Sequence, residues 1–395
     1  MQRRNLCGFD PSMEVFALCG AALSFAICTA NAGGSHGFKS LYAFKGGSDG
    51  ASPYAPLFCG TDGNFYGTTN AGGAADAGTV FRMTPKGVES VLYAFADNPD
   101  GSGPGASSVV ADAEGNLYGT TQVGGTFGNG TIYRVAPGGG ETVLYSFSDG
   151  DDGGYPNGTL VIDGTGNLYG TASGGGTHND GAAFEYSAGG SYSVLHDFAG
   201  GSDGIGPEGP LLRDGSGNLF GTTSYGGSNS QGIVYEIAAN GQESVLYAFT
   251  GGNDGGHPNG GVIEDSAGNF YGTATNDGVN GLGTVFELAP GGTLKVLHAF
   301  AGETDGAFPY GALVQNESGN LYGTTDQGGV EHQAGTVYRV TLKGRETLFH
   351  TFELSDGDNP TDGLMAVEES GKFVLYGTTV SGGASNGGTV FEIKE

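Results

Sequence analysis

Residues 116–121 read Asn-Leu-Tyr-Gly-Thr-Thr, and this hexapeptide recurs along almost the whole chain. Near-copies follow at regular intervals, the last of them in a weaker form over residues 374–379. The aromatic residue of the motif falls at Tyr66, Tyr118, Tyr169, Phe220, Tyr271, Tyr322 and Tyr376, with successive spacings of 52, 51, 51, 51, 51 and 54 residues. A period of about 50 residues is typical of arrays in which each repeat is one supersecondary unit.

Four segments with strand character recur in the same order in every period. One example of each is Leu211-Leu212, residues 219–223, residues 79–83 and residues 91–95. Aromatic and β-branched residues bounded by Gly, Asp and Asn are typical of short strands joined by tight turns. The turns before the hexapeptide, such as Ser216-Gly217-Asn218, suit a tight hairpin in which Gly takes a positive φ. The sequence therefore predicts an all-β fold with four strands per repeat.

The two ends of the repeated region are complementary. It begins with a lone fourth strand at residues 40–44 and stops with a lone third strand at residues 389–393. Together they complete one unit, which leaves no long strand edge exposed. We therefore predict a seven-bladed β-propeller of four-stranded blades, closed by pairing of the N-terminal and C-terminal strands. An open β-solenoid is the alternative.

Residues 1–32 have the pattern of a signal peptide. Arg3 and Arg4 precede an apolar run over residues 15–30, and Ala30-Asn31-Ala32 has the small residues of a cleavage site. A membrane anchor is the alternative, but the run is shorter than the roughly 20 residues that span a bilayer. We expect a secreted or periplasmic protein whose residues 33–395 form a single propeller domain. Cys59, which follows the segment, is expected to be a small buried residue.

The net charge of −28, from 14 basic and 42 acidic residues, limits the possible partners. Nucleic-acid binding depends on basic side chains that neutralise phosphates, so we expect no nucleic acid. Anionic membrane surfaces are disfavoured for the same reason. We expect a monomer whose partner, a glycan, a small molecule or a protein, binds one propeller face.

The order of the motifs resembles a known family. Gly-Asn-Leu-Tyr-Gly-Thr-Thr, Gly-Gly, Gly-Thr-Val-Tyr and Val-Leu-Tyr-x-Phe recur in sequence over residues 38–394, which is similar to the Gloeobacter–Verrucomicrobia (GloVer) tandem repeat. The resemblance implies a secreted bacterial surface or periplasmic protein, and it implies no catalytic residues. Many members carry a C-terminal anchor, whereas this sequence ends at Glu395 just after a strand, so we expect no such attachment.

An Asp-Gly-x-x-Pro motif in every repeat is the candidate ligand- or cation-binding site. In most repeats we expect a turn device, in which the Asp side chain accepts hydrogen bonds from nearby backbone N–H groups and Gly takes a positive φ. The period predicts that the seven aspartates form an acidic ring around one mouth of the central channel, and the alternative to the turn device is that this ring binds Ca²⁺, a hard ion that prefers oxygen ligands. No cofactor is required by either hypothesis. The aspartates are Asp49, Asp100, Asp152, Asp203, Asp254, Asp305 and Asp356.

No catalytic residues are predicted. His196, His298 and His350 fall at a fourth-strand position that is Tyr in other repeats, which favours packing over metal binding. We therefore expect a non-catalytic binding or scaffold module. The alternative is a propeller enzyme of the lyase or lactonase type, with acidic or metal-bound groups at the tunnel mouth. Such an enzyme would break the repeat symmetry, and the departures noted are Glu208, His257 and residues 368–374.

Overall fold

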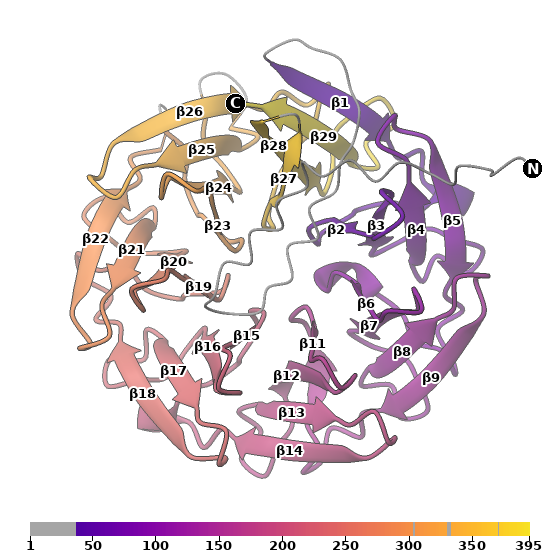
Figure 1. The fold of residues 1–395 in the computed structure, drawn as a ribbon, viewed down its shortest axis with the longest axis horizontal. Coiled ribbons are helices and arrows are strands. Elements are labelled where there is room, and N and C mark those ends of the chain that lie inside the picture. The colour runs from indigo at the N-terminus through magenta and orange to yellow at the C-terminus, as the bar shows by residue number, and fades with distance from the viewer. Residues whose placement is uncertain (1–36, 303–304, 330–332, 370) are drawn as a thin grey trace, which may run out of the picture.

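The computed structural model describes residues 37–302, 305–329, 333–369 and 371–395, which form a ring of seven antiparallel sheets around a central axis (Figure 1). The predicted seven-bladed propeller is confirmed. The predicted signal peptide, with its cleavage site, lies outside the described residues. Among the described residues the only helical elements are three 3₁₀ turns, and none is long and apolar enough to cross a membrane. These turns are η1 (Gly47–Asp49), η2 (Pro104–Ala106) and η3 (Gly201–Asp203).

The strands of each blade follow one another outward, from the innermost strand near the axis to the outermost strand on the wall of the ring (Figure 1). Blade I contains β2 (Phe58–Cys59), β3 (Phe65–Thr69), β4 (Thr79–Met83) and β5 (Glu89–Ala94). Blade II contains β6 (Val110–Ala111), β7 (Leu117–Thr121), β8 (Thr131–Val135) and β9 (Glu141–Ser146). In blade III, β10 (Gly154–Pro156) and β11 (Val161–Ile162) both pair with β12 (Leu168–Gly174), followed by β13 (Ala182–Tyr186) and β14 (Tyr192–Asp197).

The remaining blades repeat this order. Blade IV contains β15 (Leu212–Arg213), β16 (Leu219–Thr223), β17 (Ile233–Ile237) and β18 (Glu243–Ala248). Blade V contains β19 (Val262–Glu264), β20 (Phe270–Ala274), β21 (Thr284–Leu288) and β22 (Leu294–Ala299). Blade VI contains β23 (Val314–Gln315), β24 (Leu321–Thr325), β25 (Thr336–Val340) and β26 (Glu346–Thr351). Blade VII contains β27 (Met365–Glu369), β28 (Lys372–Thr379), β29 (Thr389–Lys394) and β1 (Phe38–Ala43).

Blade VII closes the ring. Its outermost strand, β1, comes from the N-terminal side of the chain and pairs antiparallel with β29, from Phe38 opposite Ile393 to Ala43 opposite Thr389. The two strands lie side by side where the ends of the described chain meet (Figure 1). The predicted closure is therefore confirmed, and it satisfies the backbone groups that β29 would otherwise expose.

Aromatic pairs hold adjacent blades together. The Phe that follows each outermost strand meets the central aromatic residue of the third strand in the next blade, edge to face, with ring centroids 5.0–5.3 Å apart in every seam. Such pairs contribute about 0.5–1.5 kcal/mol each beyond the area they bury. This contact explains the Phe of the Val-Leu-Tyr-x-Phe motif. The repeated second-strand aromatic packs against the next blade too: Tyr169 joins the core cluster of blade IV, with Leu219 and Tyr235.

A proline and a glycine fit together at every seam. A Cβ added to Gly78 would lie 2.6 Å from the Cδ atom of Pro104 in the next blade, and the other six seams give 2.5–2.7 Å. Real Cβ contacts are never this short, so the Gly of the Gly-Thr-Val-Tyr motif leaves room for the Pro of the next repeat. The residue before each Pro has a φ of 54–67° and donates its N–H to a carbonyl of the preceding blade at 2.8–3.0 Å. Backbone and small residues therefore fix how the blades meet.

Candidate functional site: one mouth of the central channel

A cavity of about 1120 Å³ lies on the axis of the ring, and its lining includes the innermost segment of every blade. One mouth is formed by the loops that enter the innermost strands together with the loops after the second strands. These two sets of loops pair with each other, as Ile205 does with Tyr225 and Ala307 with Gln327. They therefore share one face, as the sequence predicted. We call this opening the variable mouth because its side chains differ from blade to blade.

The innermost segments approach one another backbone to backbone. A Cβ on Gly209 would lie 2.5 Å from the Asn259 carbonyl oxygen, and one on Gly311 would lie 2.3 Å from the carbonyl carbon of Asp362. Only small residues fit at most of these positions, which are the second after each Pro. They are Ala55, Ala106, Gly158, Gly209, Gly260, Gly311 and, as the single exception, Asp362.

Asp362 thus places one carboxylate in the narrow part of the channel. Its side chain lines the cavity, and its Oδ1 accepts a hydrogen bond from the Gly363 N–H at 2.6 Å. Burial in the low-dielectric interior raises the pKa of Asp362 to about 7, and the bond from Gly363 offsets this only in part. A group with this pKa exchanges a proton close to neutral pH.

Tyr310 and Glu208 meet across two blades. The Tyr310 hydroxyl donates to Glu208 Oε2 at 3.0 Å, although the residues are 102 positions apart. Burial raises the pKa of Tyr310, and the negative charges of Glu208 and Asp362 raise it further, so the phenol stays protonated. Both residues occupy the position directly after Pro, where the seven repeats have Tyr54, Gly105, Asn157, Glu208, Asn259, Tyr310 and Thr361.

In each seam the residue after Pro can pair with the residue that follows the second strand of the preceding blade. The two side chains are hydrogen-bonded in two seams, whereas in a third seam polar atoms of both have no partner among the described residues. Asn157 accepts from Gln122 Nε2 at 2.9 Å in one seam, and Asn259 accepts from the Ser224 hydroxyl at 2.6 Å in another.

The seam between blades VI and VII has Asp326 and Thr361 at the equivalent positions. Asp326 Oδ1 and Thr361 Oγ1 are both buried without a hydrogen-bond partner among the described residues. Burial raises the pKa of Asp326. Buried polar atoms normally have partners, so this seam has unused capacity to bind a ligand or water.

His257 adds a strained position to the variable mouth. It precedes Pro258, its φ is 56°, and its Nδ1 lies 2.8 Å from the Ser224 carbonyl oxygen. Its ring is edge-on to Tyr225 at 4.8 Å, and Tyr225 is 51% exposed. A bulky residue at positive φ is uncommon and costs about 1–3 kcal/mol. The backbone conformation at this position is therefore fixed by the contacts between the blades and not by the side chain.

The seven predicted aspartates lie elsewhere. Each accepts from a Tyr hydroxyl or His Nε2 on an outermost strand and from the backbone N–H at the end of that strand. Asp254, for example, accepts from Tyr247 at 2.9 Å and from the Thr250 N–H at 2.8 Å. Burial alone would raise the pKa of Asp254, but hydrogen bonds from Thr250 and Tyr247 lower it. These bonds are those of the predicted turn device, and the following Gly has a positive φ in each repeat.

None of the seven aspartates is among the residues that line the channel. The prediction that they form a ring around its mouth is therefore wrong. Each Asp precedes an innermost strand in sequence, but its side chain turns back to the outermost strand, where the ring of Tyr or His provides a donor. His196, His298 and His350 take the same place as Tyr in the other repeats, 3.0–3.1 Å from their Asp. Whether the aspartates bind an ion stays a prediction.

Calcium does not fit the seven aspartates as a set. The ion takes about six to eight oxygen ligands at once, whereas these carboxylates are spread over seven seams and already accept protein bonds.

The described residues contain a single group of three ligand atoms within 4.8 Å of one another, from His196, Asp203 and Glu243 on the outer wall. A His with two carboxylates suits a transition metal better than Ca²⁺.

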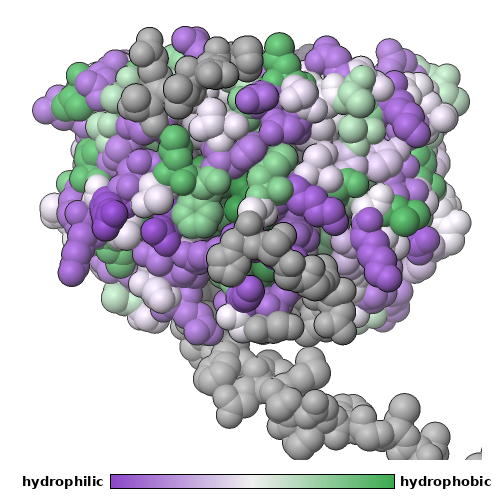
Figure 2. All heavy atoms as spheres, turned by 90° about the horizontal axis from the view of Figure 1, so that it is seen from above, coloured by the Kyte–Doolittle hydropathy of each residue, from purple (hydrophilic) through white to green (hydrophobic). Residues whose placement is uncertain are grey.

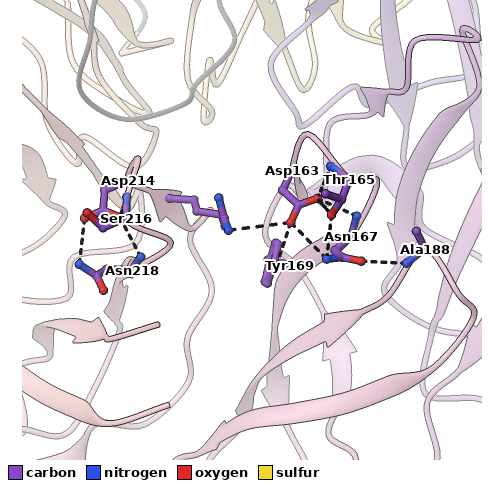
Figure 3. Close-up of polar contacts among 9 residues, drawn as sticks. Asp163, Thr165, Asn167, Tyr169, Ala188, Asp214, Ser216 and Asn218 are labelled. Carbon is purple, nitrogen blue, oxygen red and sulfur yellow. Dashed lines mark hydrogen bonds and ion pairs between the residues drawn. The ribbon is translucent and has the colours of Figure 1, made fainter. Parts of the chain in front are cut away.

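The opposite face has the turns between first and second strands, in which Asp and Asn side chains hydrogen-bond each other, as in blades III and IV. Asp163 accepts from the Thr165 N–H at 2.8 Å and from the Tyr169 hydroxyl at 3.1 Å, and Arg213 of the next blade lies 3.8 Å away (Figure 3). Although burial alone would raise it, these hydrogen bonds lower the pKa of Asp163 to about 2. Asp214 and Asn218 repeat the arrangement (Figure 3). This face is held together by its own side chains, in contrast to the variable mouth.

One side of the outer wall is seen in Figure 2. Seen from the side of β26, β29 and β1, hydrophilic and hydrophobic residues are mixed over the surface (Figure 2). The sequence pointed to two residues of the variable mouth, Glu208 and His257, as departures from the repeat. It missed Tyr310, Asp326 and Asp362. Aligning the second residue after each Pro would have revealed Asp362 among six small residues.

A family model described as the Gloeobacter/Verrucomicrobia repeat matches residues 25–215 and 206–395. No curated protein matches the chain. The extracellular domains of a proposed one-component system and of a proposed hybrid two-component system from B. thetaiotaomicron are similar in structure, with 14% and 12% identity and TM-scores of 0.56 and 0.57. The matches cover 91% and 90% of this chain but only 42% and 40% of those chains. A proposed gluconolactonase matches with 13% identity over 95% of this chain and 97% of its own, with a TM-score of 0.45. These likenesses concern the fold alone.

Proposed function

The chain belongs to the Gloeobacter/Verrucomicrobia repeat family, and we propose that it is a secreted, non-catalytic binding module whose ligand enters the variable mouth of the channel. One observation carries the proposal. The Pro–Gly contacts, the aromatic pairs and the backbone hydrogen bonds recur in every seam, whereas Glu208 and Asp362 have no counterpart in the other repeats and line one cavity together with Tyr310. Function is argued from a site rather than from a fold, and this is where unlike polar groups converge.

Export is supported by the sequence of residues 1–32, with its basic start, apolar run and small residues before Gly33. Secretion would place the variable mouth in the periplasm or outside the cell, where glycans, small molecules and other proteins are the available partners. Mass spectrometry of the exported protein tests this step. An N-terminus at Gly33 is expected, and retention of residues 1–32 would contradict it.

A thermal-shift screen of the purified protein tests the binding function. The probes are neutral oligosaccharides, aliphatic amines and divalent cations. A true ligand should raise the melting temperature of the wild type and of Glu114→Gln, an exposed carboxylate on the opposite face. It should lose this effect in Glu208→Gln, because Glu208 lines the variable mouth. A ligand whose effect depends on Glu114 and not on Glu208 would place binding at the wrong end of the channel.

A second candidate is a propeller enzyme of the lyase or lactonase type. It is favoured by Asp362, whose burial raises the pKa to about 7 and suits proton transfer near neutral pH. The test measures hydrolysis of a sugar lactone by monitoring the release of acid. A rate above the spontaneous one that disappears in Asp362→Asn would favour the enzyme, and equal rates with and without protein would remove this candidate.

A further inference from the structure

We infer that the variable mouth binds a linear aliphatic amine, whose ammonium groups are held by Glu208, Asp326 and Asp362. The inference rests on the proposed binding function and names its ligand class. Three features of the channel carry it: the sign of its charge, the spacing of its carboxylates and the unsatisfied acceptors between them.

The charge at this mouth is negative and uncompensated. Its three carboxylates come from blades IV, VI and VII, and among the described residues the cavity lining includes two basic residues, Arg82 and Arg213. Both belong to the opposite end of the channel. Arg82 is opposite Tyr66 in the β3–β4 register, and Arg213 is 3.8 Å from Asp163. Clefts lined by one sign of charge concentrate ligands of the other sign, and the net charge of −28 adds to this field.

The spacing of the carboxylates favours an extended ligand over a metal ion. Among the described residues, only His196, Asp203 and Glu243 bring three ligand atoms within 4.8 Å of one another. The three channel carboxylates therefore do not bring three ligand atoms within 4.8 Å of one another, as a compact metal site would. A chain with ammonium groups separated by methylenes reaches more than one of them. The methylenes would meet the partly buried side chains of the innermost strands, among them Val110, Val161 and Ile263.

The unsatisfied atoms call for hydrogen-bond donors. Asp326 Oδ1 and Thr361 Oγ1 are buried without partners among the described residues, and an ammonium group offers three donors and no acceptor. A neutral sugar also donates hydrogen bonds, but it would leave the buried charge of the carboxylates uncompensated. The Tyr310 hydroxyl donates a hydrogen bond to Glu208 and so orients that carboxylate.

Titration calorimetry with hexamethylenediamine tests the inference. We expect saturable binding of one molecule per chain to the wild type, and no binding of hexanediol, which has the same length without the charge. Asp362→Asn and Glu208→Gln should each weaken the affinity by roughly tenfold or more, because each removes a charge-assisted hydrogen bond. Asp362→Gly, which restores the residue of blades III to VI at this position, should have the same effect without a packing fault.

Asp151→Asn is the matched control. Asp151 is exposed, lies in a loop on the same face and does not line the channel, so this variant should bind like the wild type. Equal weakening in Asp151→Asn and Asp362→Asn would mean general attraction to an acidic protein and would overturn the inference. Binding of hexanediol or maltotriose that depends on Asp362 would overturn the ligand class and leave the proposed function standing. If the amine fails to bind, the inference is overturned, whereas the proposed function is judged by the thermal-shift screen.

Discussion

Partly buried glutamates at the blade seams should make the fold more stable in mild acid than in mild base. Glu89, Glu141 and Glu346 each begin an outermost strand, and Oε1 of each is buried without a hydrogen-bond partner among the described residues. Burial raises the pKa of each to about 7, and repulsion from the aspartate of an adjacent Asp-Gly turn adds to the effect.

The sign of the effect follows from the two pKa values of each glutamate. In the unfolded chain the pKa is near its ordinary value of 4.5. Below that pH the group is protonated in both states, and the seam holds no charge. Between pH 4.5 and about 7 the unfolded chain ionises while the folded seam keeps its proton, so the free energy of unfolding falls as the pH rises. Above about 7 the folded group ionises too, and no further stability is lost.

The magnitude can be bounded. A pKa displaced from 4.5 to about 7 corresponds to about 3 kcal/mol for a fully buried carboxyl group. These glutamates are only partly buried, so solvent screening reduces the effect to about 1 kcal/mol each. The combined variant Glu89→Gln, Glu141→Gln and Glu346→Gln keeps the shape of the protonated acid and cannot ionise. We expect it to be about 3 kcal/mol more stable than the wild type at about pH 8, and equal to it at about pH 4.

Urea unfolding at a series of pH values measures this difference. The wild-type curve alone does not isolate the contribution of the glutamates. Burial lowers the pKa of His298 and His350, so their contribution to stability changes with pH in the opposite sense. Glu114→Gln is the control, since it removes one exposed carboxylate and should leave the pH dependence unchanged. A difference between wild type and the combined variant that stays constant with pH would refute the reasoning.

Three further predictions concern the frame and the aspartates. Tyr169→Ala should cost about 3 kcal/mol in urea unfolding, as large-to-small core changes do, and a near-neutral result would place the ring outside the blade seam. Gly311→Ala should lower the melting temperature markedly because its Cβ would lie 2.3 Å from the Asp362 backbone, whereas Gly291→Ala, with no atom within 4 Å, should not. Asp152→Asn combined with Asp203→Asn should be tolerated, and calcium should not change the melting temperature of the wild type. A saturable calcium effect lost in that double variant would contradict the turn device.

The fold could be predicted because its determinants are local and repeated. The period, the four strand patterns and the turn glycines are each visible within one repeat, and repetition removes the ambiguity of a single short strand. Closure followed from counting, since a lone fourth strand and a lone third strand make one blade. The observed pairing of Phe38 with Ile393 confirms this closure.

The site could not be predicted in the same way because no single repeat contains it. Glu208, Tyr310 and Asp362 come from three blades, and they are far apart in the sequence. Only the ring brings them to one cavity. The misplaced aspartates show a related limit. The sequence shows where Asp254 lies relative to a strand. The direction of its side chain depends on a hydrogen-bond donor seven residues earlier, the Tyr247 hydroxyl.

The seams explain how a nearly symmetric ring can hold an asymmetric site. At the variable mouth the blades are joined by backbone N–H groups, by Pro against Gly and by rings buried away from the mouth. These recurring contacts do not use the side chain before or after Pro, so those positions vary from Ser52 to His257 and from Gly105 to Tyr310 while the frame is kept. The strain of a positive φ at His257 is held by the same backbone bonds. A change of ligand would therefore require only side-chain substitutions at the mouth, because the backbone that presents them is fixed independently by every seam.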